Sequence, residues 1–229
     1  MENLTDGYRA VVIGATGGIG AAVTARLQDD PRCREVIGFG RSTDGLDVTD
    51  EATIAAAAER AGEDVRLLFV ATGALEPGGH GPEKAFKQMS PEAMAAQFAL
   101  NATGPALVLK HFKPLIPREG PSRIAALSAR VGSIGDNGFG GWMGYRSSKA
   151  ALNQLLRCFA IELGRTHREA VVAALHPGTV RTPLTEGRRG NLPTMAPEES
   201  AEKLLDVLDS MTPEESGGFR DYAGEAVEW

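Results

Sequence analysis

Tyr145 and Lys149 are two side chains whose types and spacing could transfer a proton. Four residues apart on a helix, they would lie on one face. A positively charged ammonium beside a phenol favours the phenolate, so it lowers a phenol pKa that is otherwise about 10. Because the same spacing arises by chance on many solvated helices, the pair indicates this chemistry only if the rest of the chain supports it.

A glycine-rich turn at residues 14–20 could bind a phosphate group. It directly follows an apolar run at residues 9–13 and precedes a stretch of helical composition. Without side chains the backbone can approach a pyrophosphate closely, and the N-terminus of the following helix supplies amide donors. A bare glycine-rich string is often only a turn, but the strand before it and the helix after it predict a dinucleotide site. The residues expected at this site are Gly14, Thr16, Gly17, Gly18, Ile19 and Gly20.

The end of the second predicted strand carries the residues expected to distinguish NADP from NAD. An NAD-selective fold usually has an Asp or Glu about 20 residues past the glycines, where it binds the ribose 2′-hydroxyl. This chain instead has Arg41 and Ser42, a cation and a hydroxyl suited to a 2′-phosphate. The alternative is an exposed arginine in an ordinary turn. The sequence favours NADP(H) over NAD(H).

Apolar runs alternate with helical stretches along the chain and predict the elements that position these residues. The expected strands are residues 9–13, 35–39, 67–71, 123–128 and 170–175, with a shorter one at 218–222. The expected helices are residues 20–27, 51–61, 91–112, 144–164 and 197–208, with Ser90 as an N-cap before Pro91. Such alternation predicts an α/β fold, a single Rossmann-fold domain with a doubly wound, mainly parallel β-sheet and helices on both faces.

Composition narrows the class of protein. One domain over residues 1–229 is ordinary for this length, and no apolar run approaches the roughly 20 residues that a membrane-spanning helix needs. The net charge of −6 argues against nucleic acid as a partner. Cys33 and Cys158 are too few for a zinc cluster or disulfide framework, and His80 and His176 lack partners at metal-ligand spacing. We therefore expect a cytoplasmic protein with no metal and no membrane partner.

In this order the motifs resemble those of the short-chain dehydrogenase/reductase family over essentially the whole chain. The residues that match the family's catalytic tetrad are Asn101, Ser128, Tyr145 and Lys149. The resemblance implies that Tyr145 is the general acid in carbonyl reduction and the general base in alcohol oxidation. It further implies that Lys149 favours the phenolate and binds the nicotinamide ribose, and that Ser128 hydrogen-bonds the substrate oxygen.

The resemblance extends to further cofactor positions, with some departures. Ile13 stands where the family usually has Thr, and residues 70–73 retain only Gly73 of the usual Asn-Asn-Ala-Gly. The additional residues that resemble cofactor-binding positions are Asp47 and Val48 at the adenine, Ala71, Thr72 and Gly73 after the third strand, and Pro177, Gly178, Val180 and Thr182 on the nicotinamide side.

Two of the tetrad positions have support from the residues themselves. Ser128 ends a predicted strand, where a doubly wound sheet opens its crevice, whereas Ser133 is the runner-up because it is nearer Tyr145 in sequence. Pro105 has no N–H and cannot bond the carbonyl of Asn101 four residues earlier. That carbonyl could hold a water of a proton relay from Lys149, or the proline could merely kink the helix.

The expected function is that of an NADP(H)-dependent oxidoreductase acting on a small carbonyl or alcohol substrate. Residues 128–142 resemble the C-factor and sniffer-like carbonyl reductase branch of the family. The alternative is a nucleotide-binding regulatory or C-factor-like signalling protein with little turnover, which would need the dinucleotide site but neither Tyr145 nor Ser128. The resemblance also implies a homodimer or homotetramer formed through helices 91–112 and 144–164. Residues 183–197 are expected to form a substrate loop.

Overall fold

A parallel sheet forms the centre of the computed structural model, which describes residues 1–182, 185 and 193–229. Within these residues the sheet has six strands in the order β2-β1-β3-β4-β5-β6, and every neighbouring pair is parallel. The strands are β1 Tyr8–Ile13, β2 Cys33–Phe39, β3 Val65–Val70, β4 Ser122–Leu127, β5 Ala170–His176 and β6 Gly218–Asp221. The predicted α/β fold is confirmed. Most of the predicted substrate loop, residues 183–184 and 186–192, lies outside the described residues.

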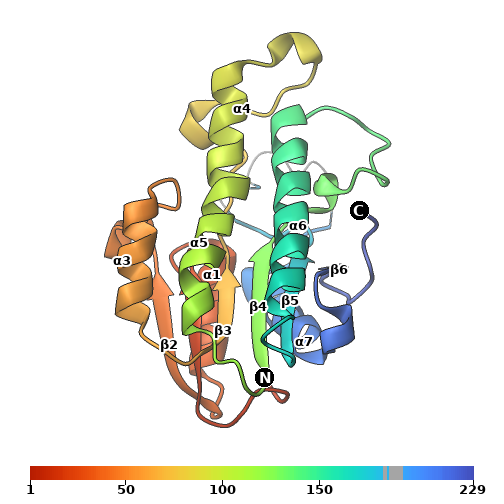
Figure 1. The fold of residues 1–229 in the computed structure, drawn as a ribbon. Helices are drawn as coiled ribbons and strands as arrows, with labels where there is room; N and C mark the ends of the chain where they lie inside the picture. Colours follow the sequence, from red (N-terminus) through yellow and green to blue (C-terminus); the bar gives the residue numbers. More distant parts are fainter. Residues whose placement is uncertain (183–184, 186–192) are drawn as a thin grey trace.

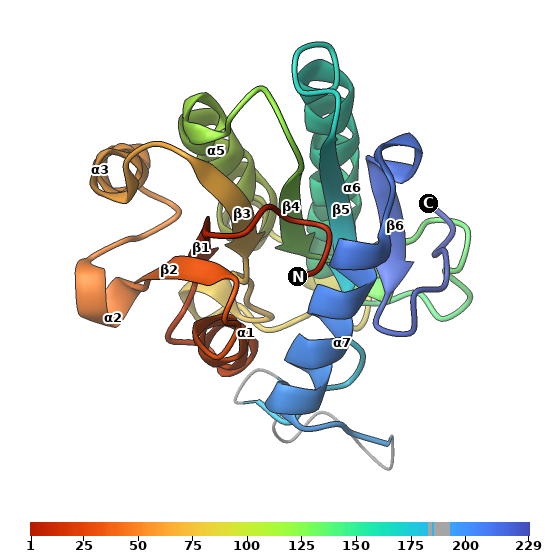
Figure 2. The ribbon, with the colours of Figure 1, turned by 90° about the horizontal axis from the view of Figure 1, so that it is seen from below.

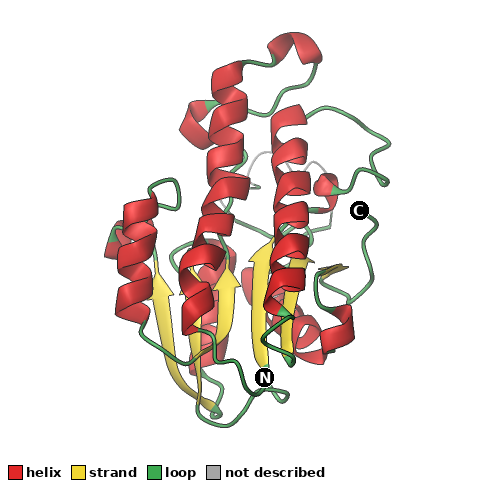
Figure 3. Cartoon of the chain, viewed as in Figure 1, coloured by secondary structure: helices red, strands yellow, loops and turns green. Residues whose placement is uncertain are grey.

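Helices cover both faces of the sheet (Figures 1 and 3). Seen from below, α3, α5 and α6 lie on one face, and α1 and α7 lie on the other (Figure 2). The α-helices are α1 Gly18–Gln28, α2 Arg41–Asp44, α3 Glu51–Ala61, α4 Pro91–Phe98, α5 Gly104–Phe112, α6 Met143–Leu163 and α7 Pro197–Ser210. None of the helices in the described ranges is long and apolar enough to cross a membrane.

Two apolar cores result from this layering. Successive strand residues point to opposite faces, so Val11 and Ile13 of β1 pack toward α3, α5 and α6, whereas Ala10 and Val12 pack toward α1 and α7. Because both faces are covered, the inner strands β1 and β5 are mainly apolar rather than alternating with polar residues, whereas the edge strands β2 and β6 carry charged side chains. That pattern made the inner strands recognisable as short apolar runs in the sequence.

Local hydrogen bonds fix several helix starts. The Ser90 side chain accepts a hydrogen bond from the backbone N–H of Ala93 at the start of α4, as expected for an N-cap. Asp50 caps α3 in the same way through the N–H of Ala52. Elsewhere the expected boundaries differ from the observed ones by one or two residues, as is usual for element ends.

The predicted helix over residues 91–112 is interrupted at its centre, near the expected irregularity at Pro105. α4 and α5 are separated by a π-helical turn at Ala99–Thr103, in which the N–H of Gly104 bonds the carbonyl of Ala99 five residues back. Pro105 cannot donate a backbone hydrogen bond, so the regular pattern is interrupted here. A Cβ on Gly104 would lie 2.6 Å from the carbonyl oxygen of Val48, so the turn packs closely against a neighbouring loop.

Candidate active site

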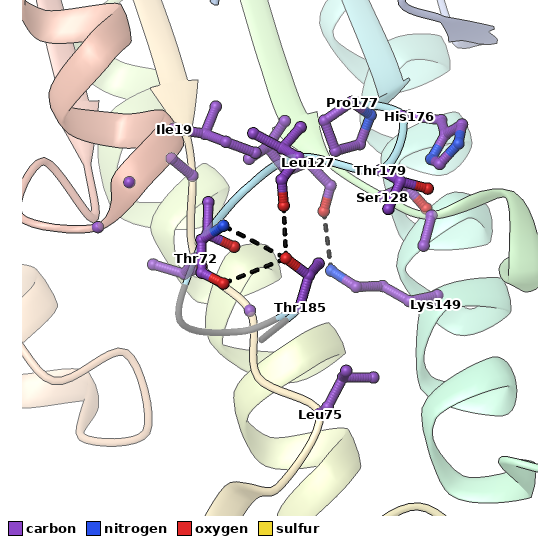
Figure 4. Close-up of a pocket in the computed structure, with 18 of the residues that line it drawn as sticks. Ile19, Thr72, Leu75, Leu127, Ser128, Lys149, His176, Pro177, Thr179 and Thr185 are labelled. Carbon is purple, nitrogen blue, oxygen red and sulfur yellow. Dashed lines mark hydrogen bonds between the residues drawn. The ribbon is translucent and has the colours of Figure 1, made fainter. Parts of the chain in front are cut away.

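A cavity of about 530 Å³ opens at the carboxyl ends of β1, β3, β4 and β5 (Figure 4). The segments after these four strands and the first turns of α6 form its walls. The predicted site residues that line it are Thr16, Gly17, Gly18, Ile19, Ala71, Thr72, Gly73, Ser128, Tyr145, Lys149, Pro177, Gly178, Val180 and Thr182. Ligands of doubly wound folds bind at this edge, outside the carboxyl ends of the strands.

Other predicted residues shape the cavity without lining it. Gly14 has φ +84°, a left-handed conformation that glycine adopts without strain. A Cβ on Gly20 would overlap the carbonyl of Gly14, so only glycine allows α1 to start so close to the turn. A Cβ on Gly18 would lie 2.7 Å from Cγ2 of Thr182, so the loop after β5 packs closely against the start of α1.

The residues predicted near the adenosine end lie away from this cavity. Arg41 and Ser42 are exposed at the start of α2, directly after β2. Asp47 accepts hydrogen bonds from the Thr49 hydroxyl and N–H, which hold the pKa of its carboxyl below the usual value. Val48 is buried in the core.

Asp44, at the end of α2, was missed by the sequence reasoning. Its carboxylate accepts hydrogen bonds from the Thr43 hydroxyl and the Gly40 N–H. These bonds, the Thr43 bond first, hold the pKa of the carboxyl below its usual value. The turn after β2 therefore holds an anion as well as the Arg41 cation.

Tyr145 and Lys149 lie together in the first two turns of α6. The N-terminal end of this helix rises beyond the strands (Figure 1). Lys149 Nζ lies 5.9 Å from the centre of the Tyr145 ring and donates a hydrogen bond of 2.8 Å to the carbonyl of Leu127. The ring of Trp142 stands edge-on to that of Tyr145, with centres 6.4 Å apart. Both members of the pair are buried, with 7% of Tyr145 and 2% of Lys149 exposed.

Burial, rather than the interaction between the two side chains, shifts the pKa of both Tyr145 and Lys149. It raises the pKa of Tyr145 above its ordinary value and lowers the pKa of Lys149 to about 7. Removal from water penalises the charged form of each group, the phenolate in one case and the ammonium in the other. We expected Lys149 to lower the pKa of the Tyr145 phenol, but in the structure burial raises this pKa instead. At neutral pH the phenol carries the proton that a general acid must donate.

Of the two candidate serines, the structure brings Ser128 to the cavity. Ser128 follows β4 directly, and its N–H bonds the carbonyl of Leu175 in β5. Its hydroxyl donates to Oδ1 of Asn153, a buried residue of α6. Ser133 does not line the cavity, and its hydroxyl accepts a hydrogen bond from the N–H of Asp136 within a turn.

Asn101 lies behind the cavity wall in the π-helical turn, and its side-chain amide is engaged at both ends. Oδ1 accepts from the N–H of Ala74, and Nδ2 donates to the carbonyl of Ala74 and to Oε1 of Gln97. A Cβ on Gly73 would lie 3.3 Å from Lys149 Nζ and 3.5 Å from Asn101 Oδ1. Gly73 therefore separates Asn101 from Lys149 and keeps that gap free of a side chain.

Several contributors to the site could not be assigned from the sequence. Glu83, in the segment before α4, is buried, and its Oε2 accepts the N–H of Gly144 in the first turn of α6. His176 at the end of β5 lines the cavity, and burial lowers its pKa to about 4, so the ring is neutral at physiological pH. Arg130 also lines the cavity and forms an ion pair of 2.7 Å with Asp221 of β6.

The family model described as "Enoyl-(Acyl carrier protein) reductase" matches residues 14–218. A 1-hydroxy-2-glutathionyl-2-methyl-3-butene dehydrogenase from Rhodococcus sp. (strain AD45) is 31% identical over 96% of this chain and 98% of its own length. The C-signal protein of Myxococcus xanthus is 37% identical over 59% of this chain and 78% of its own, which confirms the predicted resemblance to C-factor.

Solved structures agree with the sequence relatives. A putative short-chain dehydrogenase/reductase from Burkholderia multivorans, solved with bound NADP, superposes with a TM-score of 0.80 and is 30% identical. The superposition covers 97% of this chain and 99% of that one. The chain is therefore a member of the short-chain dehydrogenase/reductase family of oxidoreductases.

Proposed function

We propose that this protein is an NADP(H)-dependent oxidoreductase that transfers a hydride between nicotinamide and a small carbonyl or alcohol substrate. The observation that carries the proposal is the meeting of Ser128, Tyr145 and Lys149 in one cavity with the glycine turn. The dehydrogenase activity in the name of the Rhodococcus relative supports the reaction class. The NADP bound to the Burkholderia structure supports the cofactor.

The cavity walls fit a dinucleotide. α1 begins at Gly18 with no side-chain cap, so the N–H groups of its first turn suit a pyrophosphate. The buried Thr72 hydroxyl in the cavity wall has no hydrogen-bond partner within the described part of the chain, as expected of a group that serves a ligand. We assign Arg41 and Ser42 to a 2′-phosphate because they are exposed after β2.

Each protein group then has a defined task. The nicotinamide supplies or accepts the hydride. Tyr145, which burial keeps protonated, donates a proton to the carbonyl oxygen during reduction. Ser128 hydrogen-bonds the same oxygen and stabilises the charge that develops on it. Lys149, fixed to the carbonyl of Leu127, stands one helical turn from Tyr145 and binds the ribose next to the nicotinamide.

Removal of the Tyr145 hydroxyl tests this function. Tyr145→Phe keeps the ring against Trp142 but removes the proton donor, so we expect kcat for NADPH-dependent carbonyl reduction to fall by roughly 100- to 10,000-fold. Fluorescence titration should give an NADPH affinity close to that of the wild type. Tyr222→Phe, outside this cavity, is the matched control and should keep its activity. Unchanged turnover in Tyr145→Phe would contradict the mechanism.

The similarity to C-signal favours one further candidate, a nucleotide-binding signalling protein with little turnover. Such a protein would need the glycine turn but not the Tyr145 hydroxyl. A cellular phenotype that survives Tyr145→Phe but is lost on disruption of cofactor binding would favour signalling. The burial of Tyr145, Lys149 and Ser128 around one cavity favours the enzyme.

We also propose that the chain associates as a homodimer or homotetramer through α4, α5 and α6. α4 and α5 follow one another end to end, and α6 runs alongside both of them (Figure 1). Leu155 and Ile161 of α6 are exposed apolar side chains that such contacts would cover. The mass in solution, measured by light scattering, tests this assembly.

A further inference from the structure

The hydroxyl of Ser128 is held by a buried residue that the proposed mechanism does not use. Oγ of Ser128 lies 2.5 Å from Oδ1 of Asn153, and a carbonyl oxygen can only accept, so the serine donates its single hydrogen to it. Only 3% of Ser128 and 2% of Asn153 is exposed. In this arrangement Ser128 has no hydrogen left to donate to a substrate oxygen.

The other half of the Asn153 amide is unpaired. Nδ2 is buried and has no hydrogen-bond partner among residues 1–182, 185 and 193–229. A buried donor without a partner is unfavourable, and no second bond fixes the direction of the amide. Half a turn of the amide group exchanges its donor and acceptor with almost no change in shape. Nδ2 would then donate to Oγ of Ser128.

α6 thus contacts the end of β4 at two successive points, one helical turn apart. Lys149 Nζ donates to the carbonyl of Leu127, and Asn153 bonds the side chain of the next residue, Ser128. Residues four apart share one face of a helix, so the same face that presents Tyr145 and Lys149 also presents Asn153. The position of Asn153 is therefore fixed relative to all three groups of the proposed mechanism.

We propose that Asn153 is a positioning residue that sets the direction in which Ser128 donates its hydrogen bond. With Oδ1 toward Ser128, the hydroxyl points inward. With Nδ2 toward Ser128, the amide donates to Oγ, and the hydroxyl hydrogen is directed to the substrate oxygen. The second arrangement is the one that reduces a carbonyl. This inference rests on the role of Ser128 in the proposed function.

Asn153→Asp separates the two arrangements. The carboxylate has nearly the size of the amide and, when ionised, only accepts hydrogen bonds, so it holds the Ser128 hydrogen inward. Because burial raises the pKa of a carboxyl, kcat is compared at pH 8 and above. We expect kcat for carbonyl reduction to fall about 100-fold, with much smaller changes in KM and in NADPH affinity. Asn153→Ala leaves the serine free to turn and should lose about tenfold. Gln154→Glu is the control. It also converts an amide into a carboxylate, but at the exposed neighbouring residue, and it should leave kcat unchanged.

A double-mutant cycle with Ser128→Ala decides whether Asn153 acts through the serine. We expect Asn153→Asp to change kcat by less than about twofold once the hydroxyl is absent. A fall as large as in the wild-type background would overturn the inference, because an effect through Lys149 or through the fold would persist. A second double-mutant cycle combines Asn153→Ala with Ser128→Ala, so the test does not depend on how well the Asp variant folds. Wild-type kcat in Ser128→Ala would contradict the proposed function itself.

Discussion

Burial of Tyr145 and Lys149 favours the neutral form of both side chains. It raises the pKa of the phenol and lowers the pKa of the ammonium from its ordinary 10.5 to about 7. Near neutral pH Lys149 is therefore poised between charged and neutral forms, whereas Tyr145 keeps its proton. A group with a pKa near the working pH exchanges protons readily, which suits the neighbour of the proposed general acid.

Lys149→Met gives a pH-dependent test of this burial. Between pH about 7 and about 10.5 the unfolded chain binds a proton at Lys149 that the folded chain has released, so the free energy of unfolding of the wild type rises with pH. Below this window the full cost of the buried charge remains. Allowing for the lost bond to Leu127, we expect Lys149→Met to be more stable by roughly 2–4 kcal/mol at pH 6, with the difference shrinking toward pH 10. Urea unfolding at pH 6, 8 and 10 measures it, and a constant difference would contradict the cause.

Residue type and spacing predicted some residues of the candidate site. Others could be identified only from contacts between segments that are distant in the sequence. Tyr145, Lys149 and Ser128 could be predicted because a helical spacing and a strand end place them. Asn153 and Glu83 could not, because their partners lie 25 and 61 residues away in the chain and neither residue type is unusual in its segment. The one sequence feature that could have indicated Asn153 is its position four residues after Lys149, on the same face of the predicted helix.

At the scale of elements, continuous apolar runs predicted the strands within about two residues, since a sheet covered on both faces needs them. The break between α4 and α5 was predictable only in part. Pro105 indicated an interruption, but an apolar pattern of helical period does not distinguish a kink from a π-helical turn. The turn presents Asn101, whose amide bonds both backbone groups of Ala74 and so fixes the segment after β3 that contributes Gly73 to the cavity.

The start of α6 depends on Glu83, which belongs to a segment distant in sequence. Its carboxylate accepts the N–H of Gly144, and its backbone carbonyl accepts the N–H of Trp142. Glu83→Ala would leave the buried Gly144 N–H unpaired, which costs about 1–3 kcal/mol of stability. Glu83→Gln keeps an acceptor and loses only the favourable charge at the helix N-terminus, worth roughly 0.3–1 kcal/mol. Urea unfolding should rank the wild type above Gln and Gln above Ala, and equal loss in both variants would exclude the cap.

At the scale of the molecule, the cavity joins segments that follow β1, β3, β4 and β5, so one ligand would contact both halves of the sheet. A ligand that binds only the folded chain raises its stability, by about 2.7 kcal/mol at 100 times its Kd. For a domain of this size that corresponds to several degrees in Tm. Stabilisation by dinucleotides therefore reports the site as a whole, independently of turnover.

We expect the balance between Arg41 and Asp44 to determine which dinucleotide stabilises the molecule more. The Asp44 carboxylate is occupied by Thr43 and the Gly40 N–H, whereas Arg41 is exposed in the same turn, so we expect NADPH to raise Tm more than NADH at equal concentration. Arg41→Ala should remove most of that difference and leave the NADH shift unchanged, because only the 2′-phosphate needs the cation. Arg118→Ala, an exposed arginine in the loop that enters β4 at the opposite edge of the sheet, is the control and should behave as the wild type. An equal or larger shift with NADH in the wild type would overturn the assignment of Arg41 and leave Asp44 as the residue that selects the cofactor.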